Sequence, residues 1–154
     1  MAMKKVTSQV MSSNIGLYEH ININQYCYSG VTAGTWVTVG ATLAEQTMNE
    51  FMYNSSGAQN NQIDYKSYFT GGTYSFRVKF DRNTDRGIIT LLVDGSSVGT
   101  VDTYGTSARN QLGTITGISI PAGAHTISLK VESKNASSSA YYVVYGMMGF
   151  WRTA

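Results

Sequence analysis

The feature that most restricts the fold of this chain is a strict alternation of apolar and polar side chains in its second half. The apolar positions of the clearest stretch are Tyr74, Phe76, Val78 and Phe80. The residues between them are Ser75, Arg77 and Lys79, followed by Asp81. A period of two predicts a β-strand with one buried face and one face in water, because successive side chains of a strand point to opposite sides.

Further strands are predicted on both sides of this stretch. Toward the C-terminus they cover residues 88–93, 97–101, 112–120, 125–131 and 140–151. Asp94 and Gly95 predict a tight hairpin between the first two, since Asp-Gly readily adopts the positive φ angles of a two-residue turn. Two further turns are expected, one at Gly71 and Gly72 and one at residues 121–123, which include the chain's one proline. Polar loops are expected at residues 82–86, 103–111 and 133–139.

The first half of the chain shows weaker patterns. Residues 1–14 are polar and mixed and are interpreted as an N-terminal connector. Strands are expected at residues 21–27 and 35–39, and a loop at residues 54–61. Residues 43–52 fit either a short helix or an irregular strand, and the pattern leaves both open.

These patterns favour an all-β chain. Turn signals recur about every 8 to 12 residues, as an antiparallel β-sandwich requires. The helix–strand alternation of a doubly wound α/β fold does not occur. We therefore expect residues 15–154 to form one antiparallel β-sandwich domain, a size that suffices for a real core.

Charge and hydropathy exclude several classes of function. Charged residues make up 13% of the chain and the formal net charge is +2. No run of five basic residues occurs, so nucleic-acid binding by a dense cationic patch is not expected. No apolar stretch approaches the roughly 20 residues of a spanning helix, so membrane insertion is not expected either. No signal peptide is visible. The polar, weakly charged composition suits proteins that work outside cells or in virions.

Several motifs carry a resemblance to a known family. They are GTYSF at residues 72–76, RGIITLLVDG at 86–95, AGAHTISLKV at 122–131 and KNASSSAYY at 134–142. Together, residues 65–153 resemble the galactose-binding-like β-sandwich, the jelly roll used by many carbohydrate-binding modules. The final residues FWRT resemble the chain ends of bacteriophage tail-fibre and virion surface proteins that carry this module. The resemblance implies a jelly-roll scaffold and a glycan ligand.

Catalytic chemistry is not indicated. Cys27 is the one cysteine, and His20 and His125 are the two histidines. We interpret Cys27 as a partly buried strand residue and His125 as a hydrogen-bonded structural residue. The nine acidic residues include no pair that stands out as the two facing carboxylates of a glycosidase. The nucleophile elbow and the glycine-rich phosphate loop do not occur. We expect a protein that is not an enzyme.

No cofactor is expected, with a structural calcium ion as the one alternative. Asp81, Asn83 and Asp85 alternate as at the start of a calcium loop, but the ligands that should follow are missing. Many modules of this type bind a structural calcium ion. Asp81, Asp94 and Asp102 are therefore kept as weak calcium ligands.

A glycan site needs aromatic rings to pack on the C–H faces of sugars, and polar side chains to hydrogen-bond the hydroxyls. The chain has 11 tyrosines, and several fall on or beside expected loops with polar residues near them. The predicted ligand-binding residues are Tyr53, Tyr68, Arg86, Asp102, Tyr104, Arg109, Asn135 and Tyr141.

Three functions fit these sequence features. The first is a bacteriophage virion surface protein, a tail-fibre head or capsid decoration domain that attaches to host-surface glycans. It would be a homotrimer and contact other virion proteins, since Val144 and Met147 make the last strand apolar on both faces. The alternatives are a carbohydrate-binding module of a secreted bacterial enzyme and a purely structural capsid protein. Location follows function: the virion for the first and third, secretion for the second.

Overall fold

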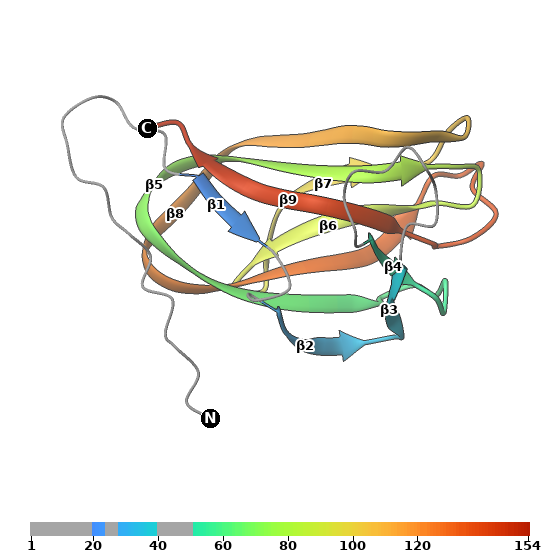
Figure 1. The fold of residues 1–154 in the computed structure, drawn as a ribbon, viewed down its shortest axis with the longest axis horizontal. Coiled ribbons are helices and arrows are strands. Elements are labelled where there is room, and N and C mark those ends of the chain that lie inside the picture. Colours follow the sequence, from blue (N-terminus) through green and yellow to red (C-terminus); the bar gives the residue numbers. More distant parts are fainter. Residues whose placement is uncertain (1–19, 24–27, 40–50) are drawn as a thin grey trace.

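The computed structural model describes residues 20–23, 28–39 and 51–154. Every regular element in this part of the chain is a β-strand (Figure 1). The strands are β1 (His20–Ile23), β2 (Tyr28–Ala33), β3 (Trp36–Val39), β4 (Phe51–Asn54), β5 (Gln62–Arg82), β6 (Gly87–Val93), β7 (Ser96–Asp102), β8 (Ala108–Lys134) and β9 (Val144–Arg152). The expected connector, residues 1–14, and Cys27 lie outside the described residues.

Two long strands, β5 and β8, build both layers of the sandwich. They pair antiparallel along most of their length and bend together at one end of the molecule (Figure 1). Beyond the bend on one side, β8 pairs with β6, β6 with β7, and β5 with β2. On the other side β5 pairs with β9, and β9 with β4 and β1, while β3 adds to β4. All of these pairings are antiparallel, so the predicted all-β sandwich is confirmed.

The bend corrects two predictions. Gly71 and Gly72 were expected to form a turn that ends a strand, and so were residues 121–123. Instead both segments lie inside continuous strands, and the register runs on from Thr70–Ala122 to Gly72–Ile120. Pro121 sits opposite Gly71, whose φ of 86° is open to glycine and strained for other residues. A proline is tolerated there because the backbone leaves regular ladder geometry at the bend.

The other boundaries agree more closely with the sequence. Asp94 and Gly95 form the β6–β7 hairpin with φ angles of 49° and 81°, the positive values that the turn requires. The loops at 55–61 and 83–86 lie where they were expected, but the loop after β7 is shorter, since β8 already begins at Ala108. The last strand begins later than predicted, at Val144. Of the segment 43–52, only Phe51 and Met52 are described, and they belong to β4.

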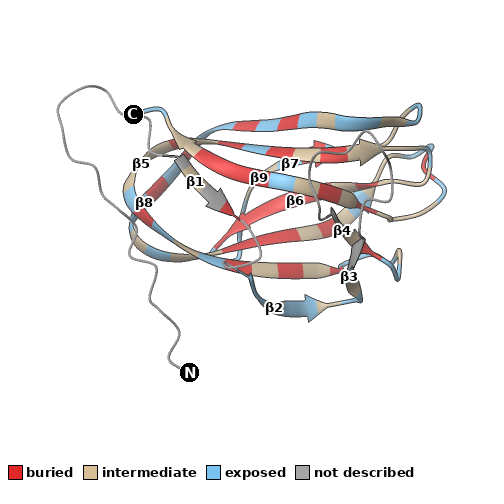
Figure 2. Ribbon diagram, in the orientation of Figure 1, coloured by how far each residue is buried: buried red, intermediate tan, exposed pale blue. Residues whose placement is uncertain are grey.

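The core lies between the two layers and is strongly aromatic. Buried and exposed residues alternate along β5 and along the first half of β8, as the sequence pattern predicted (Figure 2). Phe150 packs against Phe69 and Phe76, with ring centroids 5.1 and 5.0 Å apart. Three tyrosines, Tyr65, Tyr74 and Tyr145, are also buried, and the hydroxyls of Tyr65 and Tyr145 hydrogen-bond to each other over 2.5 Å.

The arrangement of the strands gathers most loops at one end. Residues 55–61, 83–86, 103–107 and 135–143 all connect strands at the end of the sandwich opposite the bend (Figure 1). We call these four segments together the loop end. Among the described residues no helix is long and apolar enough to cross a membrane.

Candidate functional site

The loop end brings together nearly all of the predicted ligand-binding residues. Tyr68 is the exception: it precedes the bend of β5, at the opposite end of the sandwich, and is 66% exposed. The residues at the loop end, or on a strand that starts or ends there, are Tyr53, Arg86, Asp102, Tyr104, Arg109, Asn135 and Tyr141. Their convergence follows from topology, because each lies at or beside a connection between antiparallel neighbours.

The clearest aromatic pair joins Tyr53 to Tyr142. Tyr53 lies near the end of β4 and Tyr142 lies in the loop before β9. Their ring centroids are 5.5 Å apart, with an angle of 32° between the ring planes. Both residues are half-buried, so each ring still has surface in contact with water. Tyr142 was not among the predicted residues.

The neighbouring Tyr141, one of the predicted residues, contacts other groups than Tyr53 does. Its ring packs against the core cluster, and the Lys134 ammonium lies over the ring at 5.2 Å from the centroid. Adjacent residues of an extended segment point to opposite sides, so only one of the two tyrosines can face Tyr53. The sequence pattern AYYVV did not distinguish which one.

An ion pair lies beside this aromatic pair. The Arg86 guanidinium donates to the Asp85 carboxylate over 2.7 Å and, through Nε, to the carbonyl oxygen of Asp81 over 3.3 Å. Only 13% of the Arg86 side chain is exposed, against 34% for Asp85. The guanidinium is therefore held in place from two sides, and the Asp85 side chain is partly exposed to solvent.

The pKa of the Tyr53 phenol is affected by these groups. Its pKa is raised, first by burial and then by the neighbouring phenol of Tyr142. The charge of Arg86 lowers this pKa and that of Asp85 raises it, both by less than burial does. Tyr53 therefore stays neutral near pH 7 and keeps a hydroxyl that can both donate and accept a hydrogen bond.

Backbone hydrogen bonds fasten the two loops that carry these side chains. The Gly87 N–H donates to the carbonyl of Tyr142 over 2.8 Å, and the Tyr142 N–H donates to the carbonyl of Asp85 over 3.2 Å. The hydroxyl of Thr103, itself fully buried, donates to the carbonyl of Gly87 over 2.6 Å. Residues 85–87 thus link loop 83–86 to loops 103–107 and 135–143.

A second polar group at the loop end contains three of the predicted residues. The carboxylate of Asp102 accepts from Asn135 Nδ2 over 3.0 Å and from the Tyr104 N–H over 2.9 Å. The oxygen of Asn135 in turn accepts from the Ser137 N–H over 3.1 Å. Arg109 is exposed near the start of β8. These contacts shape the loops.

The three weak calcium ligands do not form a common site. Asp94 sits in the β6–β7 hairpin, where its carboxylate bonds His125 Nδ1 over 2.5 Å, while His125 Nε2 bonds the carbonyl of Pro121 over 3.0 Å. The prediction that His125 is structural is thereby confirmed. Asp81 accepts from the Asn110 N–H, and both oxygens of Asp102 are engaged. Within the described ranges, no three residues of the usual metal-ligating types cluster.

Comparison with known proteins identifies the fold. No protein-family model matches the sequence, and no curated protein matches it significantly. Solved structures do match. A Paenibacillus xanthan lyase aligns with 86% of this chain and 13% of its own, at 23% identity and a TM-score of 0.68. The CBM36-1 domain of a multidomain xylanase from the hindgut metagenome of Trinervitermes trinervoides aligns over 90% of this chain and 98% of its own, at 17% identity and a TM-score of 0.64.

A third match is a CBM36 carbohydrate-binding module in complex with calcium and xylotriose. It aligns with 86% of this chain and 98% of its own, at 14% identity and a TM-score of 0.57. At these identities the matches show the fold: the chain has the β-sandwich jelly roll of carbohydrate-binding modules. This chain spans nearly the whole length of the two modules and a small part of the lyase.

Proposed function

We propose that this protein is a non-catalytic carbohydrate-binding module that binds a glycan at the loop end. The observation that carries the proposal is the half-buried Tyr53–Tyr142 pair beside the Asp85–Arg86 ion pair. Tyrosine faces pack on the apolar C–H surface of a sugar ring. The fixed guanidinium and the part-exposed carboxylate supply a donor and an acceptor for its hydroxyls.

The acidic side chains support binding rather than hydrolysis. A glycosidase needs one carboxylic acid with a raised pKa opposite a second carboxylate. At the loop end Asp85 is committed to an ion pair and Asp102 to two hydrogen bonds. Elsewhere, the hydrogen bond from His125 lowers the pKa of Asp94, and the hydrogen bond from Lys130 lowers the pKa of Glu132. Both shifts are opposite to what a general acid requires.

The setting that we propose is a secreted bacterial enzyme to which the module belongs. The structures compared above are a xanthan lyase and carbohydrate-binding modules, one of them from a multidomain xylanase, so they support a module of an enzyme over the virion surface. The virion location, the homotrimer and the host-glycan attachment remain predictions from the sequence. Met147 on β9 is 45% exposed, which leaves room for the predicted subunit contact. Light scattering tests it: a monomer excludes the trimer, and a trimer favours the virion setting.

Binding is tested by calorimetry with xylo-, cello- and manno-oligosaccharides and by an array of acidic and neutral glycans. We expect at least one ligand to bind, and Tyr142→Ala to weaken it roughly tenfold, about the upper value of an aromatic contact. Tyr68→Ala removes an equally large ring at the opposite end and should leave the affinity unchanged. Equal losses in both variants would place the site elsewhere, and a blank panel would contradict glycan binding.

A calcium titration completes the test. If the glycan binds equally well in EDTA and in calcium, the ion has no role in the site. If calcium is required, substitutions of Asp81 and Asp102 identify whether either of these two residues is a ligand.

A further inference from the structure

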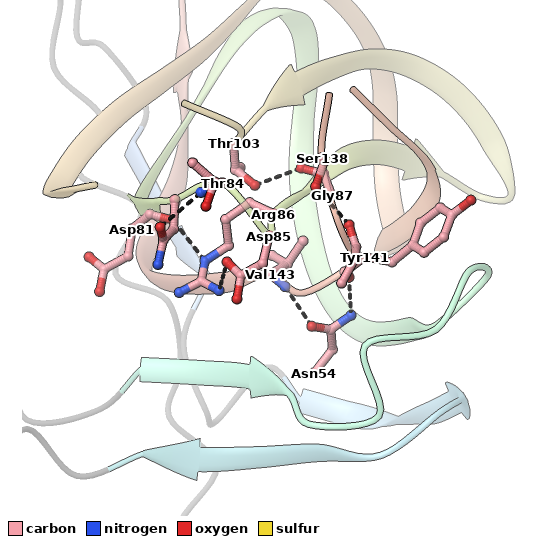
Figure 3. Close-up of polar contacts among 12 residues, drawn as sticks. Asn54, Asp81, Thr84, Asp85, Arg86, Gly87, Thr103, Ser138, Tyr141 and Val143 are labelled. Carbon is pink, nitrogen blue, oxygen red and sulfur yellow. Dashed lines mark hydrogen bonds and ion pairs between the residues drawn. The ribbon is translucent and has the colours of Figure 1, made fainter. Parts of the chain in front are cut away.

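One buried amide connects the strand that carries Tyr53 to the loop that carries Tyr142. Asn54 is fully buried at the end of β4. Its Nδ2 donates to the carbonyl of Tyr141 over 2.8 Å, and its Oδ1 accepts from the Val143 N–H over 2.5 Å (Figure 3). Its own backbone N–H donates to the carbonyl of Val143 over 3.2 Å. The side chain therefore holds the residues on both sides of Tyr142.

The ladder pairs of β4 and β9 explain why these side-chain hydrogen bonds are needed. They are Met52–Tyr145 and Tyr53–Val144, and they stop before residue 143. Beyond that point the loop leaves strand geometry, and Asn54 replaces the missing pairs with side-chain hydrogen bonds. Tyr142 itself is fixed from the other side by its backbone bonds to Asp85 and Gly87. The backbone is therefore hydrogen-bonded at residues 141, 142 and 143, and the Tyr142 ring projects from it toward Tyr53.

We propose that Asn54 is the positioning residue of the glycan site, which holds the Tyr142 ring against Tyr53 before ligand arrives. The inference rests on the proposed function for its effect on affinity. Asn54 does not touch the ligand, because it is fully buried. A ring that is already in place loses little conformational freedom on binding, so the affinity gains from preorganisation.

An amide suits this position because it presents a donor and an acceptor at once. An aspartate can replace the acceptor but, when ionised, places a second oxygen against the carbonyl of Tyr141. A protonated aspartic acid restores both roles, since its O–H donates and its C=O accepts. Asn54→Asp should therefore restore the wild-type hydrogen bonds only at a pH low enough to protonate the introduced carboxyl group.

The chain offers a matched control in Asn61, a second buried asparagine at the loop end. Asn61 is 3% exposed, and its Nδ2 donates to the hydroxyl of Ser56 over 2.5 Å. It therefore anchors the loop 55–61 rather than the backbone of Tyr142. Asn54→Ala and Asn61→Ala each remove one buried amide, so both should lower thermal stability.

The variants differ in what they do to Tyr53. The resonance of Tyr53 in tyrosine-labelled protein is assigned by its loss in Tyr53→Phe, and its titration is followed by NMR. In Asn54→Ala we expect the pKa of Tyr53 to fall toward that of an ordinary tyrosine, because burial beside Tyr142 is what raises it. In Asn61→Ala the pKa of Tyr53 should stay as in the wild type.

Affinity is measured at a temperature where both variants are folded. We expect Asn54→Ala to weaken glycan binding about tenfold, as loss of the Tyr142 ring would, and Asn61→Ala to leave it near the wild-type value. Asn54→Asp serves as the second variant if Asn54→Ala does not fold. We expect Asn54→Asp to bind glycan poorly at pH 8 and to regain affinity as the pH is lowered. An unchanged Tyr53 titration in Asn54→Ala, or equal losses in the two alanine variants, would overturn the positioning role. If the wild type binds no glycan, the proposed function fails alone, since the Tyr53 titration still tests the positioning.

Discussion

The aromatic core near the bend and the loop end are stabilised by different interactions. Near the bend, Phe69, Tyr74 and Phe150 pack edge to face with ring centroids 5.1 to 6.4 Å apart. At the loop end, Asn54 and Thr103 use buried polar atoms to fasten irregular backbone. Apolar packing is non-directional, so the core depends on volume, whereas the loop end depends on the position of single hydrogen bonds. Substitutions should therefore affect stability most near the bend and ligand binding most at the loop end.

The largest effect is expected from Phe150→Ala. Phe150 is fully buried and contacts Phe69, Tyr74 and Phe76. The cavity left by a buried phenylalanine typically costs about 3–5 kcal/mol, so we expect a loss of that size in urea unfolding. Met147→Ala is the control, since Met147 lies on the same strand and is exposed. A loss below about 1 kcal/mol in Phe150→Ala would mean that the core does not depend on this packing.

Gly57→Ala should produce a smaller loss of stability and a clear loss of binding. Gly57 has a φ of 54°, and a Cβ there would overlap the ring of Tyr142. The left-handed backbone costs roughly 1–2 kcal/mol for alanine, and the ring must move away from Tyr53. Gly95→Ala, at a φ of 81° with open space around it, carries similar strain without the overlap. Only Gly57→Ala should weaken glycan binding; equal affinities would contradict the placement of Tyr142 in the site.

Thr103→Val tests a polar contact of the loop end with almost no change in shape. It removes the buried hydrogen bond to the carbonyl of Gly87. We expect a loss of about 0.5–1.5 kcal/mol in urea unfolding, the usual net value of such a bond. Thr100→Val on the neighbouring strand β7 is exposed and should change stability by less than about 0.5 kcal/mol. No difference between the two variants would mean that the loops hold together without this bond.

The smallest effect is expected from Asp94→Asn, which keeps a residue that favours this hairpin turn. The hydrogen bond from His125 holds the pKa of Asp94 below its usual range. A depressed pKa in the folded state stabilises the protein above the unfolded value of about 3.9, and this contribution is lost as the pH falls through the folded value. Because Asp94 is half exposed, we expect only about 0.2–1 kcal/mol at pH 7. The variant and the wild type should converge near pH 2, and a constant difference would contradict the charge effect.

The strands of the sandwich and the loop end also differ in how much of their structure the sequence predicts. The alternation at residues 74–80, the Asp94–Gly95 hairpin and the antiparallel β-sandwich were predicted because each depends on a local pattern, whereas the jelly roll was predicted from the resemblance of residues 65–153 to a known family. Gly71 and Pro121 were interpreted as turns because such residues mark a departure from strand geometry. They do not reveal that a partner strand bends at the same place and keeps its register.

The sequence predicted candidate site residues on or beside loops, but it did not predict which of their side chains meet. Tyr53 and Arg86 were identified because they combine aromatic or charged chemistry with a position beside a loop. The Tyr53–Tyr142 contact and the hydrogen bonds of Asn54 were not predicted, because segment 135–143 has no periodic pattern that fixes which side chain faces which way. Its conformation is set by hydrogen bonds to residues 54, 85 and 87, far away in the sequence.

The long pairing of β5 with β8 has a consequence for how the chain folds. Its pairs are nested: Arg82 with Ala108 encloses residues 83–107, and each later pair lies just outside the one before, out to Gln62 with Lys130. Once the innermost pair has formed, every further pair closes almost no additional loop, so the entropy of loop closure is lost mainly once. A ladder that joins residues distant in sequence can thus form by zipping from the loop end toward the bend and past it. Both layers of the sandwich would then arise in one continuous process.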